Sequence, residues 1–90
     1  MKKCVATCVY QNNQILAISV NYNGNLIQLY RYDGDNSIHY SSFSELYKAV
    51  LAILENNNFR VSSLEMFGRT WYNVQFINVL NPTYIDRFSL

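Results

Sequence analysis

The sequence has few of the residues from which most enzymatic and metal-binding sites are built. Among 90 residues there are one histidine, two cysteines, three glycines and one proline. A single histidine, His39, excludes histidine-based metal clusters, and the spacing Cys4-x-x-x-Cys8 is not a zinc spacing. The three glycines fall at turn signals, which leaves no glycine-rich phosphate loop. We therefore expect no metal, no cofactor and no enzymatic activity.

Charge is also scarce. Charged residues make up 14% of the chain, and 7 lysines and arginines nearly balance 6 acidic residues. A protein that binds nucleic-acid backbones normally carries a clear basic stripe, and a disordered chain combines low hydrophobicity with high net charge. Half of the residues are hydrophobic. This composition indicates one folded domain spanning residues 1–90.

The chain also lacks long hydrophobic runs. No stretch approaches the roughly 18 apolar residues of a membrane span, and Met1 leads into an alternating segment rather than the apolar run of a signal peptide. On a strand, Cys4 and Cys8 would lie roughly 13 Å apart, too far for a disulfide. We expect buried free thiols, although nearby lysines leave a reactive thiol open. The predicted location is cytoplasmic, with no membrane partner.

What the first forty residues do have is regular turn signals. Asn12-Asn13, Asn23-Gly24 and Asp33-Gly34 suit two-residue hairpin turns, and the runs between them are rich in strand-forming residues. They predict a four-stranded β-meander over about residues 3–40. The register that each turn implies gathers nine side chains on one face, which we expect to be buried: Val5, Val9, Leu16, Ile18, Val20, Ile27, Leu29, Ile38 and Tyr40.

A helix is predicted next. Ser42-Phe43-Ser44-Glu45 forms a capping box, and apolar residues then follow at helical spacing, namely Leu46, Ala49, Val50, Ile53 and Leu54. We expect this helix, over 43–56, to cover the apolar face of the meander. This arrangement would place the hydrophobic core between one helix and one sheet.

The last third predicts a hairpin. Residues 59–67 and 70–79 flank Gly68-Arg69, which fits a type II′ turn, and an apolar-rich tail that docks or meets a partner follows over 84–90. The predicted fold class is α+β: an antiparallel four-stranded β-meander packed by one α-helix and followed by a C-terminal β-hairpin, in the order ββββ-α-ββ.

Two surfaces remain for function. One is the second face of the meander, which is nearly free of charge, and the other is the hairpin tip near Met66. Tyrosine, tryptophan and arginine anchor many protein interfaces because they bury much area and keep a polar group. We expect partner binding by the residues of these types and their neighbours: Tyr10, Gln28, Tyr30, Tyr32, His39, Arg69, Trp71 and Tyr72.

These features predict a small, non-enzymatic protein–protein interaction module whose partner is a host protein or a second copy of the chain. Small size and twelve asparagines suit a phage or mobile-element inhibitor, of the anti-CRISPR or another anti-defence type, although AT-rich coding also explains the asparagines. The alternative is a single-stranded nucleic-acid-binding protein that stacks bases on the tyrosine-bearing face. A homodimer formed through the edge of the first or last strand is a third option.

Overall fold

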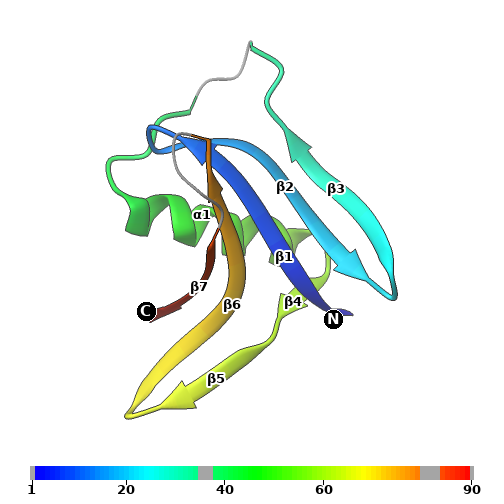
Figure 1. The fold of residues 1–90 in the computed structure, drawn as a ribbon, viewed down its shortest axis with the longest axis vertical. Helices are drawn as coiled ribbons and strands as arrows, with labels where there is room; N and C mark the ends of the chain where they lie inside the picture. The colour runs from blue at the N-terminus through cyan, green and yellow to red at the C-terminus, as the bar shows by residue number, and fades with distance from the viewer. Residues whose placement is uncertain (1, 35–37, 80–83, 90) are drawn as a thin grey trace.

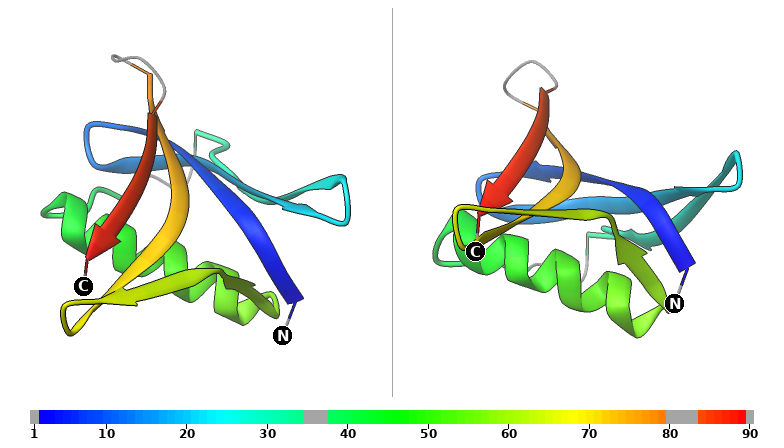
Figure 2. Two further views of the ribbon diagram at one scale, coloured as in Figure 1. Left: turned by 60° about the horizontal axis from the view of Figure 1, so that its bottom comes forward. Right: turned by 90° about the horizontal axis from the view of Figure 1, so that it is seen from below.

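One mixed β-sheet and one α-helix make up the part of the chain that the computed structural model describes, residues 2–34, 38–79 and 84–89 (Figure 1). The strands run in the order β3-β2-β1-β6-β5, with β4 also paired to β1 and β7 to β6. The α-helix lies along one side of this sheet (Figure 2). The α+β class is therefore confirmed. The elements are β1 (Lys2–Gln11), β2 (Gln14–Tyr22), β3 (Asn25–Arg31), α1 (Phe43–Asn56), β4 (Phe59–Val61), β5 (Ser63–Met66), β6 (Arg69–Asn78) and β7 (Tyr84–Ser89).

The first two predicted turns are confirmed. Asn12 and Asn13 both have positive φ, at 51° and 59°, and so do Asn23 and Gly24, at 52° and 78°. Two consecutive residues with positive φ are what a type I′ turn requires, and asparagine and glycine adopt this conformation at low cost. β1, β2 and β3 therefore form the antiparallel meander that the sequence predicts.

The fourth strand of the meander is not formed by the described residues of that region. Residues 35–37 lie outside the described part, and beyond them only an isolated bridge joins His39 to Gln14. The backbone N–H of Tyr40 donates to the carbonyl of Asn13 at 2.9 Å. The chain thus returns past the β1–β2 turn instead of pairing along β3, and the predicted pairing of Ile38 with Leu29 is wrong.

The sheet is also mixed rather than antiparallel. Residues Ala6–Tyr10 of β1 pair in parallel with Val74–Asn78 of β6, and Lys2–Cys4 pair in parallel with β4. β1 is therefore the central strand, and α1 lies in the connection that crosses from the meander to the later strands (Figure 1). Neither β1 nor β6 is an exposed edge, because β7 pairs with the other side of β6. The expectation that either strand offers a free edge for a homodimer is therefore wrong.

Two β-bulges change which residues face the helix. Near the turn Tyr10 pairs with Ile15 as predicted, but Val9 pairs with Ala17, so Leu16 is an extra residue in β2. A second shift leaves Leu29 as the extra residue in β3. One extra residue shifts the register by one, so that beyond the bulge each residue shares a face with a different partner from the one that the turn alone predicts.

The face of β1 predicted to be buried is consequently the outer one. Val5 is 51% exposed, whereas the alternate residues Cys4, Ala6, Cys8 and Tyr10 are buried together with Ile15, Ile18 and Val20 of β2. Small side chains on the central strand leave room for the bulky residues that pack on it, among them Phe76 and Tyr47, both fully buried. Aromatic rings contact one another in this core: the ring centroid of Phe76 lies 4.9 Å from that of Phe43 and 5.6 Å from that of Tyr47.

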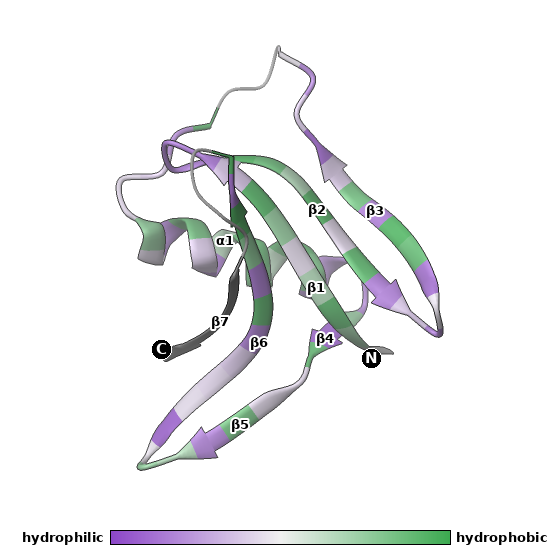
Figure 3. Cartoon of the chain, in the orientation of Figure 1, coloured by the Kyte–Doolittle hydropathy of each residue, from purple (hydrophilic) through white to green (hydrophobic). Residues whose placement is uncertain are grey.

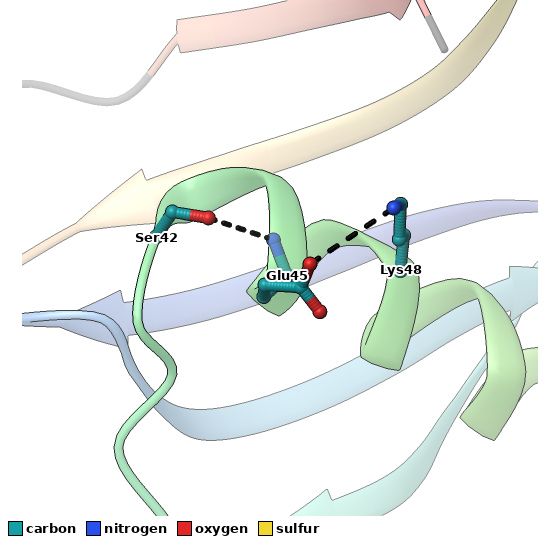
Figure 4. Close-up of polar contacts among 3 residues, drawn as sticks. All are labelled: Ser42, Glu45 and Lys48. Atoms are coloured by element: carbon teal, nitrogen blue, oxygen red, sulfur yellow. Dashed lines mark hydrogen bonds and ion pairs between the residues drawn. The ribbon is translucent and has the colours of Figure 1, made fainter.

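The predicted helix is confirmed over Phe43–Asn56. The hydroxyl of Ser42 accepts a hydrogen bond from the backbone N–H of Glu45 at 3.2 Å, and Glu45 also pairs with Lys48 (Figure 4). The buried side of the helix is formed by Leu46, Tyr47, Val50 and Leu54. Tyr47 is the one fully buried helix residue that the predicted stripe omits.

Candidate functional site

The uncharged face proposed from the sequence is not assembled as one surface. Tyr10 is only 8% exposed and belongs to the core. Tyr30 lies on the helix side, where it lines a small cavity of about 70 Å³ together with Ile15, Tyr40 and Ile53. Gln28 pairs with Ser19 on the other side of the sheet and is exposed. The β3 bulge separates Tyr30 from Gln28 because it breaks the alternation between them.

The remaining two predicted residues of that face lie beyond the end of β3. Tyr32 is half-buried, and its backbone N–H donates to the carbonyl of Leu16 at 2.8 Å. His39 is exposed beside Gln14. No row of aromatic rings therefore lines one face of β1–β3 in the described part of the chain, and a base-stacking surface is not assembled there.

The second predicted surface, the β5–β6 hairpin, is divided between its two sides. Ser63 pairs with Tyr72 and Leu64 with Trp71. Tyr72 is on the helix side, with its ring centroid 6.3 Å from that of Tyr47. Since side chains alternate along a strand, Trp71 is on the opposite side with Leu64, and the next pair on that side is Met66 and Arg69.

The outer side of this hairpin carries exposed apolar side chains close together. On this side Leu64 is 47% exposed and Met66 45%, and Trp71, which pairs with Leu64, is half-buried; Phe67, in the adjoining turn, is 93% exposed. Among the paired residues of β5 and β6 in this hairpin, Arg69 supplies the only charge on this side, because Glu65 pairs with Thr70 on the helix side. We name Leu64, Met66, Phe67, Arg69 and Trp71 the hairpin surface. The hairpin that carries it extends past the rest of the fold (Figures 1 and 2).

Phe67 is the residue that the sequence interpretation missed. We expected the turn at Gly68-Arg69, but Met66 pairs with Arg69, so the turn residues are Phe67 and Gly68. Both have positive φ, at 54° and 75°. A bulky L-residue in this region is strained, whereas glycine is not. The sequence does contain a signal for the observed turn. A turn at Phe67-Gly68 pairs the apolar residues Leu64 and Trp71, whereas a turn at Gly68-Arg69 does not.

A polar hollow lies at the base of the hairpin surface. It has a volume of about 180 Å³ and is lined by Ser62, Ser63, Leu64, Trp71 and Asn73. The backbone N–H of Asn73 donates to the carbonyl of Ser62 at 3.0 Å, where the chain passes from β4 to β5. The indole N–H of Trp71 is buried and has no hydrogen-bond partner among the described residues. The base of this side is thus neutral and rich in hydrogen-bonding groups.

An apolar pocket lies on the opposite, helix side of the hairpin. Its volume is about 270 Å³, and its walls come from α1, β4 and β6. Leu54, Phe59 and Val61 form a floor that is 1%, 6% and 4% exposed. Exposed Glu55 and Arg60 stand at its rim, and the lining residues are Leu51, Leu54, Glu55, Phe59, Arg60, Val61 and Tyr72.

The environment of the two cysteine thiols disfavours their reactive thiolate form. Both cysteines are free and buried on the helix side of β1. Burial raises the pKa of the Cys8 thiol to about 12 and raises that of Cys4 as well. A thiol held in its protonated form is a poor nucleophile, so the option of a reactive cysteine is not supported at Cys8.

Nowhere in residues 2–34, 38–79 and 84–89 do three or more histidine, cysteine or acidic side chains gather as they would around a metal ion. Within the same ranges, no helix combines the length and the apolar character needed to cross a membrane.

Comparison with family models, with curated proteins and with solved structures gives no match for this chain. The geometry of the hairpin surface and of the two hollows beside it is therefore the basis for a functional conclusion.

Proposed function

We propose that this protein is a non-enzymatic protein-binding module that contacts its partner through the hairpin surface. The observation that carries the proposal is Phe67, which is 93% exposed and held at a φ of 54°. At this position a phenylalanine gains almost no burial and adds backbone strain, so it does not serve the stability of the fold. Strained residues that the fold does not need are concentrated at binding and catalytic sites.

The composition of the surrounding residues supports binding to protein. Aromatic residues, methionine and arginine are enriched at the centres of protein interfaces. The hairpin surface contains Phe67, Trp71, Met66 and Arg69 within a four-pair hairpin. Figure 3 shows hydrophobic colouring at the middle of β5 and, paler, toward the turn, with hydrophilic colouring at the head of the β5 arrow and at the start of β6. An exposed apolar group rimmed by polar residues is typical of an interaction site.

The proposed mode of action is occupation of a site on another protein, as an inhibitor or adaptor would do. Small size and a composition with twelve asparagines support the narrower proposal of an inhibitor encoded by a phage or mobile element. The nucleic-acid alternative depends on stacked tyrosines, and the burial of Tyr10 and the helix-side position of Tyr30 argue against it.

The experiment compares proteins captured from cell lysate by three immobilised forms of the chain. The hairpin variant combines Leu64→Ser with Phe67→Asn, and the matched control is Leu26→Ser. Leu26 is 76% exposed on β3, at the other end of the strand order. We expect the wild type and the control to capture the same protein and the hairpin variant to lose it. Capture that is unchanged in the hairpin variant would refute the proposal.

A further inference from the structure

The hairpin tip and the apolar pocket are complementary in size. A pocket of about 270 Å³ is below the roughly 300–1,000 Å³ of small-molecule sites, and it suits one or two inserted side chains. The tip presents Phe67, a side chain that is 93% exposed and stands at a tight turn. One molecule therefore carries both a protruding aromatic ring and a shallow apolar recess that can receive such a ring.

The tip cannot reach the pocket of its own chain. Tyr72 forms a wall of the pocket, and Arg69, at the tip, precedes it by three residues on the same strand. At about 3.3 Å per residue this separation is roughly 10 Å, and the pairing of Met66 with Arg69 fixes the direction of the turn. Insertion of the tip into such a pocket therefore requires a second molecule.

The charges at the two places are complementary as well. The tip carries Arg69 on its outer side and Glu65 on its helix side. The rim of the pocket carries Glu55 and Arg60. All four side chains are exposed, and none forms an ion pair within residues 4–34 and 38–79. Insertion of the tip into a second copy would bring Arg69 and Glu65 of one copy toward the pocket rim of the other copy, which also carries one acidic and one basic side chain.

We propose that the pocket of each molecule receives Phe67 from a second copy of this chain, in a reciprocal dimer. Arg69 then approaches Glu55 of the other copy. This inference rests on the proposed function, since it names the partner of the same hairpin. A two-fold arrangement uses both tips and both pockets at once and closes the assembly. A one-way insertion would instead continue into a chain of molecules.

Light scattering over a concentration series, from low micromolar to about one millimolar, tests the dimer. We expect the mass to rise from that of one chain to that of two and then to level off. Phe67→Asn should weaken self-association about a hundredfold, because each of two lost ring insertions accounts for roughly tenfold. Asparagine accepts positive φ readily, so this variant keeps its fold. Circular dichroism checks that it does.

Charge reversal identifies the interface. Arg69→Glu and Glu55→Arg, each made alone, should weaken the dimer, and the double variant should recover it, because the two sites meet across the interface. A mass of one chain at every concentration would overturn the inference, as would a dimer that Phe67→Asn leaves intact. Masses that grow without limit would overturn the reciprocal arrangement. Hairpin-dependent capture of a different protein by a strictly monomeric chain would preserve the proposed function and overturn only the second-copy partner.

Discussion

Substitution of Phe67 by asparagine should make the protein more stable. An L-residue in the left-handed region costs roughly 1–2 kcal/mol, and asparagine reduces this cost because its short side chain hydrogen-bonds locally. The ring of Phe67 is 93% exposed, so its loss removes only about 0.1–0.2 kcal/mol of burial from the roughly 1.5–3 kcal/mol that full burial provides. We expect the free energy of unfolding to increase by about 1 kcal/mol.

Thermal and urea denaturation at low micromolar concentration measure this change without a contribution from self-association. For a domain of this size, about 1 kcal/mol corresponds to a rise of roughly 4–8 °C in Tm. Phe67→Ala is the matched control, because alanine removes the ring and keeps the Cβ that causes the strain. We expect its stability to lie within about 0.5 kcal/mol of the wild type.

Two results would refute the reasoning. If Phe67→Ala loses more than about 1 kcal/mol, the ring packs on its own chain and is not available to a partner. If Phe67→Asn is no more stable than Phe67→Ala, the turn is not strained, and the argument that links Phe67 to binding loses its physical basis.

Three further predictions concern the core, the helix and the thiols. Phe76→Ala should cost about 3–5 kcal/mol in urea denaturation, because Phe76 is fully buried among three rings; a loss under about 1 kcal/mol would contradict the core described above. Ser42→Ala should cost about 1 kcal/mol through the lost N-cap, whereas Ser41→Ala, one position earlier, should not. Burial raises the pKa of Cys8 from 9.0 to about 12, so the folded state keeps a proton that the unfolded chain loses. The stability from this group is fully present below pH 9 and falls as pH rises from about 9 to about 12, and Cys8→Ala should show a smaller decline over that interval than the wild type.

Local signals in the sequence predict the local parts of the fold. The asparagine turns, the Ser42 N-cap and the helix over Phe43–Asn56 each depend on residues within a few positions of one another, and all are confirmed. Of the predicted capping box only the bond to the Ser42 hydroxyl is formed, because the carboxylate of Glu45 pairs with Lys48 instead. The parallel pairing of β1 with β6 joins residues that are 68 positions apart, such as Ala6 and Val74. No turn or cap encodes such a pairing, because it depends on how the completed elements pack.

The facing of β1 could not be predicted for a different reason. Both sets of alternate residues are apolar enough to be buried: Val5 and Val9 on one side, and Cys4, Ala6, Cys8 and Tyr10 on the other. Hydrophobicity alone favours the valines. The choice is made by shape, since α1 and β6 bring Tyr47, Phe43 and Phe76 against the central strand, and small residues there leave the space that these rings occupy.

The bulge at Leu16 therefore determines more than the packing of two strands. It lets Tyr10 and Ile15 share a side with Cys8 and Ile18, and so it places in the core a tyrosine that a regular register would expose. With the similar shift at Leu29, the described residues of β1–β3 present no exposed row of aromatic side chains. Among residues whose side chains the structure describes, Phe67 is a fully exposed aromatic residue at a turn where an asparagine would be more stable. The same physical preferences that bury the sheet tyrosines leave the hairpin surface as the place proposed for partner binding.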